Sequence, residues 1–165
     1  MKLRTKAKAQ AKIVLSNSIQ FLDHIPDRTY DCLFTDPLYI TDVRDYESFT
    51  QSWVQKAFSK IKLTGCGFIF CSSNPQEISI YWHQLSQVSN FIIGNLLIWY
   101  YENTIGPSPK HVFKNNWQGI FYLYGKDAKP LDSPLKKEQF SVLKYSAPDG
   151  RNETKYHPHQ KPKEL

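Results

Sequence analysis

The chain has 165 residues, the length of one domain that can bury a hydrophobic core. Its 21 lysine and arginine residues outnumber 15 acidic residues, and the net charge of +6 favours a polyanionic partner, above all nucleic acid, although a merely soluble basic surface has the same composition. The longest apolar stretch, 91–101, is too short to span a bilayer, and no apolar signal segment follows the basic N-terminus, so we expect neither a membrane protein nor a secreted one.

The three cysteines are odd in number, and none has the Cys-x-x-Cys spacing of a zinc site. They are typical of thiols in a reducing compartment, so we expect a cytoplasmic protein without a metal. His157 and His159 could be read as metal ligands, but no second pair at suitable spacing supports this, and solvated loop histidines are the better interpretation.

Apolar runs alternate with amphipathic segments along the first 125 residues. Continuous apolar runs predict strands, and apolar residues at helical spacing behind capping side chains such as Asn17 predict helices. A glycine-containing turn is expected at 64–67. The expected strands cover 13–15, 32–35, 68–71, 92–100 and 119–124, and the expected helices cover about 17–25, 46–61 and 72–85.

Strands that alternate with helices predict an α/β fold with a mostly parallel sheet, whose last two strands form an antiparallel pair at its edge. From residue 126 onward, prolines and lysines are frequent and periodicity is lost. We therefore divide the chain into a main α/β part, 1–125, and a basic, proline-rich extended segment, 126–165, with one short strand near 140–145.

The run Asp36-Pro37-Leu38-Tyr39 directly follows a predicted strand, and strand ends are where open α/β folds place their chemistry. The Asp36 carboxylate and the Pro37 carbonyl can accept hydrogen bonds from the exocyclic amine of a base, and so receive the positive charge that develops when the amine reacts. The Tyr39 ring can stack on a base flipped out of a duplex. An ordinary Asp-Pro turn is the alternative interpretation.

This run resembles the Asp/Asn/Ser-Pro-Pro-Tyr/Phe signature of the DNA amino-methyltransferases that modify adenine N-6 or cytosine N-4. The run from His157 to Leu165, HPHQKPKEL, is similar to the HPTQKPLEL motif of the same family and is the more specific match. The likeness extends over nearly the whole chain, and its order resembles the beta class. Further similar segments lie at 12–22, 30–39, 67–72 and 95–100.

The resemblance implies a Rossmann-like, S-adenosylmethionine-dependent methyltransferase that acts on double-stranded DNA, as in restriction-modification systems. It implies that Asp36 and Pro37 hold the amine and that Tyr39 stacks the base. Aspartate at the first position leans toward adenine over cytosine. By the same resemblance, the cofactor contacts are Asn17, His157, Gln160, Lys161 and Pro162. DNA contacts are expected from Leu38, from Lys110 and Lys114 in the loop 103–118, and from the basic tail, although a plain solvated loop is the alternative for the lysines.

The chain also departs from the family pattern. Leu38 replaces the second proline, which makes the turn less rigid, Asn17 replaces a cofactor-binding aspartate, and His159 replaces a threonine. The family's Phe-x-Gly-x-Gly cofactor loop and its two central strands have no counterpart in these 165 residues. We therefore expect a truncated or split enzyme with an incomplete cofactor site, and a second chain that supplies the cofactor loop.

Two other functions remain open at this point. One is a catalytically inactive remnant or accessory subunit that only binds nucleic acid, which Leu38 and the missing glycine loop favour. The other is an RNA methyltransferase or RNA-binding protein, which would prefer single-stranded RNA.

Overall fold

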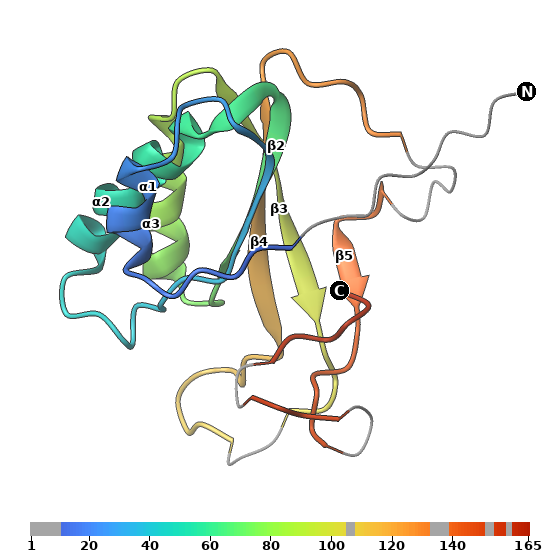
Figure 1. Cartoon of the computed structure of the whole chain (residues 1–165). Coiled ribbons are helices and arrows are strands. Elements are labelled where there is room, and N and C mark those ends of the chain that lie inside the picture. The colour runs from blue at the N-terminus through green and yellow to red at the C-terminus, as the bar shows by residue number, and fades with distance from the viewer. Residues whose placement is uncertain (1–10, 105–107, 133–138, 151–153, 158–159) are drawn as a thin grey trace, which may run out of the picture.

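The computed structural model describes residues 11–104, 108–132, 139–150, 154–157 and 160–165, and these residues form one sheet with helices on one of its faces (Figure 1). Strands and helices alternate through the first part of the chain, as predicted. The elements are α1 (Ser18–Asp23), β1 (Tyr30–Thr35), α2 (Tyr46–Ser59), β2 (Ile61–Cys71), α3 (Pro75–Ser86), β3 (Phe91–Tyr100), β4 (Trp117–Gly125) and β5 (Val142–Lys144).

The sheet of the described residues has the strand order β1-β2-β4-β3-β5. β1 is parallel to β2 and β3 is parallel to β5, whereas β4 is antiparallel to both of its neighbours. Four strands therefore run in one direction, and the predicted antiparallel pair of β3 and β4 is confirmed. The pair is not at the edge, because β5 adds to the outer side of β3. As a result, the carboxyl ends of β1, β2 and β3 lie at the same end of the sheet as the start of β4.

The main core lies between the sheet and the helices α1, α2 and α3, which all cover the same face (Figure 1). Helix α2 places Val54 and Phe58 in this core, four residues apart on one side of the helix, and β4 contributes Phe121 and Leu123, two residues apart. A smaller cluster of Phe70, Trp99 and Ile120 lies on the opposite face. No described helix covers that face, and no described helix is long and apolar enough to cross a membrane.

Two local predictions were wrong. The β-branched run at 13–15 is not a strand, because no described strand lies beside it to pair with its backbone, and Ile13 is 97% exposed. The expected turn at 64–67 is instead the middle of β2, which already begins at Ile61, a residue predicted to end the preceding helix. Gly65 and Gly67 are needed there for close packing: a side chain would collide with the Asp31 carbonyl at Gly65 and with the Phe58 ring at Gly67.

Strand β1 forms one edge of the described sheet, and its side chains are unusually open to solvent. Tyr30 is 47% exposed and Phe34 is 65% exposed. Strands in parallel sheets are normally covered on both faces. The Asp36 segment directly follows this open strand.

Candidate active site

The turn after β1 brings Asp36 and Tyr39 together. The Tyr39 N–H donates to Asp42 Oδ2 at 3.1 Å, and the Asp42 N–H donates to the Tyr39 carbonyl at 2.8 Å. This closed turn directs the Tyr39 hydroxyl back to Asp36, where it donates to Oδ1 at 2.7 Å. Burial, followed by the hydrogen bond to Asp36, raises the pKa of Tyr39, so the phenol stays protonated at neutral pH and can act as this donor.

Lys161 completes the arrangement from the far end of the chain. Its Nζ lies 2.9 Å from Asp36 Oδ2 and 3.0 Å from the Tyr39 hydroxyl oxygen. The Lys161 side chain is 19% exposed and that of Asp36 is 31% exposed, so this is a partly buried ion pair. The sequence motif at 157–162 and the one at 36–39 therefore meet in space, and Lys161 reaches the residue expected to hold the base amine.

Three aromatic rings surround the same ammonium group. Lys161 Nζ lies 5.3 Å from the centroid of Phe70, 5.6 Å from that of Tyr39 and 5.9 Å from that of Trp99. Rings at these distances attract a cation through their quadrupoles. We call the group of Asp36, Tyr39, Phe70 and Trp99 the ammonium box. Its negative carboxylate and aromatic faces suit an amine that carries, or develops, positive charge.

Glu77 of α3 supports the turn and was missed by the sequence analysis. Its side chain is fully buried, and its two oxygens accept hydrogen bonds from the N–H of Ile40 at 2.9 Å, the N–H of Ser72 at 2.6 Å and the hydroxyl of Ser72 at 2.9 Å. The one local signal was the spacing from Asn74, the N-cap of α3, to Glu77, which is typical of a capping box. Glu77 instead ties the end of β2 to the turn after β1.

The other residues assigned to base or DNA contact lie near the same end of the sheet. Leu38 is 55% exposed next to Pro37 in the turn. Lys110 is exposed and Lys114 is half-buried, and both precede the start of β4. His159 and the basic residues before position 11 lie outside the described residues.

The residues assigned to cofactor binding do not form one site within the described chain. Asn17 caps α1, accepting hydrogen bonds from the N–H groups of Ile19 and Gln20 at 3.0 and 3.2 Å, on the face of the sheet that the helices cover. Lys161 lies against Phe70 and Trp99 on the opposite face.

The loop before Lys161 is held by the Gln160 amide, which accepts from the Tyr156 N–H at 2.8 Å and donates to the Thr154 carbonyl at 3.0 Å. His157 is exposed and Pro162 is buried. Among the described residues, the assigned cofactor contacts therefore lie in two places, with Asn17 at the start of α1 and Lys161 against Phe70 and Trp99.

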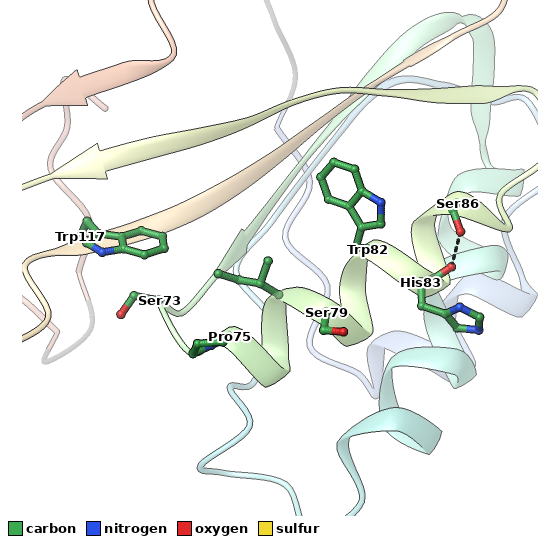
Figure 2. Close-up of a pocket in the computed structure, with 8 residues that line it drawn as sticks. Ser73, Pro75, Ser79, Trp82, His83, Ser86 and Trp117 are labelled. Carbon is green, nitrogen blue, oxygen red and sulfur yellow. Dashed lines mark hydrogen bonds between the residues drawn. The ribbon is translucent and has the colours of Figure 1, made fainter. Parts of the chain in front are cut away.

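Among the hollows of the described chain, two lie beside the helices that cover the sheet. A groove of about 630 Å³ runs between α1, α2 and β1 and reaches Asp36, Pro37 and Leu38 at one end. A second hollow, of about 560 Å³, lies along α3 beside Trp117, and Figure 2 shows Trp82 rising from that helix toward the sheet. The Trp82 ring packs edge-on against Phe121 at 6.0 Å. Because none of the residues of the ammonium box lines the second hollow, we place the candidate site at the box and the adjoining groove.

The described strands and helices form a Rossmann-like α/β arrangement with a mixed sheet and one antiparallel strand inside it. Solved structures share it. The PvuII DNA methyltransferase, which is cytosine-N4-specific, matches with a TM-score of 0.66 at 15% identity, over 82% of this chain and 57% of its own. The M1.HpyAVI–SAM complex matches with a TM-score of 0.60 at 22% identity, over 87% of this chain and 66% of its own.

TTHA0409 of Thermus thermophilus, assigned as a DNA modification methylase and solved with S-adenosyl-L-methionine, matches with a TM-score of 0.57 at 14% identity, over 77% and 65% of the two chains. At these identities the likeness establishes the fold. The chain spans less than two thirds of the length of these three structures. No model of a protein family and no curated protein matches it.

Proposed function

We propose that this chain is the base-binding part of a DNA methyltransferase that transfers a methyl group from S-adenosylmethionine to the exocyclic amine of adenine or cytosine. The observation that carries the proposal is the contact between Asp36 and Tyr39 at the carboxyl end of β1. It places a carboxylate acceptor beside an aromatic ring, and the remaining lone pairs of the carboxylate can accept hydrogen bonds from an amine. By the family resemblance, the aspartate at the first motif position leans toward adenine over cytosine.

The basic loop before β4 supports contact with DNA. Lys110 and Lys114 flank Val112 and Phe113, and the Phe113 side chain is 98% exposed. Lysines can neutralise phosphates, and an exposed ring next to them can lie against bases. Because β4 starts at the end of the sheet where β1 finishes, this loop lies on the same side of the molecule as Asp36.

A further segment is part of the proposal, because two surfaces of the described chain are open. β1 has no described neighbour on its outer side. Aromatic rings form a row on the face that no described helix covers. Phe34 and Phe68 are 6.2 Å apart in this row, Phe68 and Tyr122 are 5.1 Å apart, and Phe34 is 65% exposed. Exposed apolar patches and free strand edges mark surfaces that bind protein. We infer that the segment with the cofactor loop, in a continuing or separate chain, covers them.

Transfer of labelled methyl groups from S-adenosylmethionine to DNA tests the function. The chain is assayed alone and together with a polypeptide that supplies a Phe-x-Gly-x-Gly segment, taken from the nucleotide sequence that follows Leu165 or from a neighbouring reading frame. We expect incorporation with the added segment, and loss of at least about 100-fold in Asp36→Ala. Asp132→Ala, which changes an exposed aspartate after β4, is the control. Incorporation that survives Asp36→Ala would refute the role of this carboxylate.

A nucleic-acid-binding protein without catalysis is the second candidate, and the separation of Asn17 from Lys161 on opposite faces of the sheet favours it. Salt-dependent DNA binding without heat of S-adenosylmethionine binding, with and without the added segment, would select this candidate. A preference for single-stranded RNA over DNA in the same titrations would select an RNA-directed protein instead.

A further inference from the structure

The ammonium box already holds an occupant in the free protein. The Lys161 ammonium sits between Asp36 Oδ2 and the Tyr39 hydroxyl, with the rings of Phe70 and Trp99 around it. A surface ion pair of the same chain is much more open: the Lys144 side chain, paired with Glu102, is 65% exposed, whereas that of Lys161 is 19% exposed. The contact is therefore built into the fold, and is not a loose ion pair on the surface.

The segment that carries Lys161 is anchored on the sheet. Pro162 is buried, and the Leu165 N–H donates to its carbonyl at 3.3 Å, which curls the segment back on itself. The Leu165 side chain packs against the cluster that contains Phe70 and Trp99. These contacts position the Lys161 side chain over the box.

The position of the ammonium matches the chemistry of the proposed substrate amine. Both groups are nitrogen donors that seek the Asp36 carboxylate, and both can lie against the Tyr39 ring. A neutral base amine donates a weaker hydrogen bond than an ammonium group does, so it competes poorly in the ground state. Once the amine attacks a methyl group, it carries positive charge and resembles the ammonium that the box binds. The box is therefore complementary to the charged transition state more than to the neutral base.

We propose that Lys161 is a resident competitor of the base: its ammonium fills the Asp36 pocket in the free protein, and the amine of adenine or cytosine binds only when Lys161 withdraws. This inference rests on the proposed function, because it takes the base amine as the ligand of Asp36. It makes Lys161 a specificity-determining residue, since only a base whose stacking and amine contacts together outweigh the internal ion pair displaces it.

Nucleoside titrations of the full chain test the inference. Adenosine, cytidine and purine riboside, which lacks the exocyclic amine, are added to the ¹⁵N-labelled protein. Binding is read from the backbone amide signals of residues 35, 36 and 38–40, since Pro37 has no N–H. Lys161→Met keeps most of the apolar stem and removes the charge. Lys163→Met, at an exposed position in the same segment, is the matched control. We expect Lys161→Met to bind adenosine or cytidine roughly tenfold more tightly than the wild type, and Lys163→Met to be unchanged.

A second measurement uses the wild type alone and does not depend on a variant that folds. The ¹⁵N signal of the Lys161 ammonium should shift to that of an exposed lysine as adenosine or cytidine binds, and should not respond to purine riboside. Equal or weaker binding by Lys161→Met, or an ammonium signal that stays unchanged at saturation, would overturn the competitor role and leave the base pocket intact. Failure of both nucleosides to bind the wild type and Lys161→Met would instead remove the base pocket itself, and the proposed function with it.

Discussion

The buried carboxylate of Glu77 accepts a hydrogen bond from the N–H of Ile40, so α3 holds the turn that carries Asp36 and Tyr39. The same carboxylate accepts from the N–H and hydroxyl of Ser72, which follows β2. One side chain thus joins the ends of two neighbouring strands. The three groups that donate to Glu77 each reach one of its carboxylate oxygens. The buried carboxylate therefore has hydrogen-bond partners in the interior.

Glu77→Gln should destabilise the protein. A glutamine has one acceptor oxygen, and its NH₂ group would face one of the three donors that Glu77 now satisfies. We expect the free energy of unfolding to fall by about 1–3 kcal/mol, the cost of a buried polar group without a partner. Urea denaturation measures this, with Glu164→Gln at an exposed position as the control. A change below about 0.5 kcal/mol would show that Glu77 does not hold the turn.

Tyr81→Phe should have the opposite effect. The Tyr81 side chain is fully buried, and its hydroxyl makes no well-formed hydrogen bond with a described residue, although the Tyr46 hydroxyl lies near it. Because phenylalanine keeps the ring and removes the unpaired hydroxyl, we expect the variant to be at least as stable as the wild type, by about 0–2 kcal/mol. Urea denaturation at pH 7 is the measurement. A clear loss of stability would mean that the hydroxyl has a partner after all.

Alkaline pH should weaken the fold, and Tyr81→Phe should reduce this effect. Burial, above all, raises the pKa of Tyr81 well above its ordinary value of 10.0. Below pH 10 the phenol is protonated in both the folded and the unfolded chain, so the stability is fully present. As the pH rises above 10, the unfolded chain releases the proton first, and the free energy of unfolding falls. Between pH 10 and pH 11 we expect a loss of about 1 kcal/mol from Tyr81, absent in Tyr81→Phe. Tyr156→Phe, at a residue that is 81% exposed, should behave like the wild type.

The helices were predictable because their signals are local. Asn17 and Asn74 cap α1 and α3 with their side-chain oxygens, as such residues do at helix starts, and the apolar spacing along α2 matches its buried face. The misread segments depend on distant partners. In the sequence alone, Gly65 is typical of a turn, and only the structure shows that the Asp31 carbonyl lies against it. A strand at 13–15 needs a neighbouring strand that the described chain lacks.

The candidate site was predictable in part for the same reason. Asp36 and Tyr39 are three residues apart, so one closed turn brings their side chains together. The contact of Lys161 with Tyr39 and that of Glu77 with Ile40 join residues more than 35 positions apart, and no periodicity or spacing reveals such pairs. Even the family resemblance, which placed Lys161 near the methyl donor, did not indicate the ion pair with Asp36.

Removal of the two loop lysines should weaken DNA binding uniformly across sequences. Lys110 and Lys114 precede β4 at the end of the sheet where Asp36 lies. Each lost phosphate contact lowers the slope of log K against log salt by about 0.9. We expect Lys110→Ala with Lys114→Ala to reduce the slope by nearly twice that. Fluorescence anisotropy at several salt concentrations is the measurement. The control is the double variant Lys126→Ala with Lys129→Ala, because these lysines follow β4 at the opposite end of the sheet. An equal loss of DNA affinity in the two double variants would show that the lysines act only through non-specific charge attraction.

Phe34→Lys should weaken association with the segment that carries the cofactor loop and leave the folding of this chain nearly unchanged. The Phe34 side chain is 65% exposed on the open face, so a lysine there should change the free energy of unfolding of this chain by less than about 1 kcal/mol. If the segment with the cofactor loop covers that face, the lysine would bury a charge in the interface and weaken association by about 2 kcal/mol or more, some 30-fold. Phe140→Lys, at a ring that is 64% exposed beside β5, is the matched control. Titration calorimetry with that segment measures the affinity of both variants. Equal affinity of the two variants would move the proposed interface away from β1.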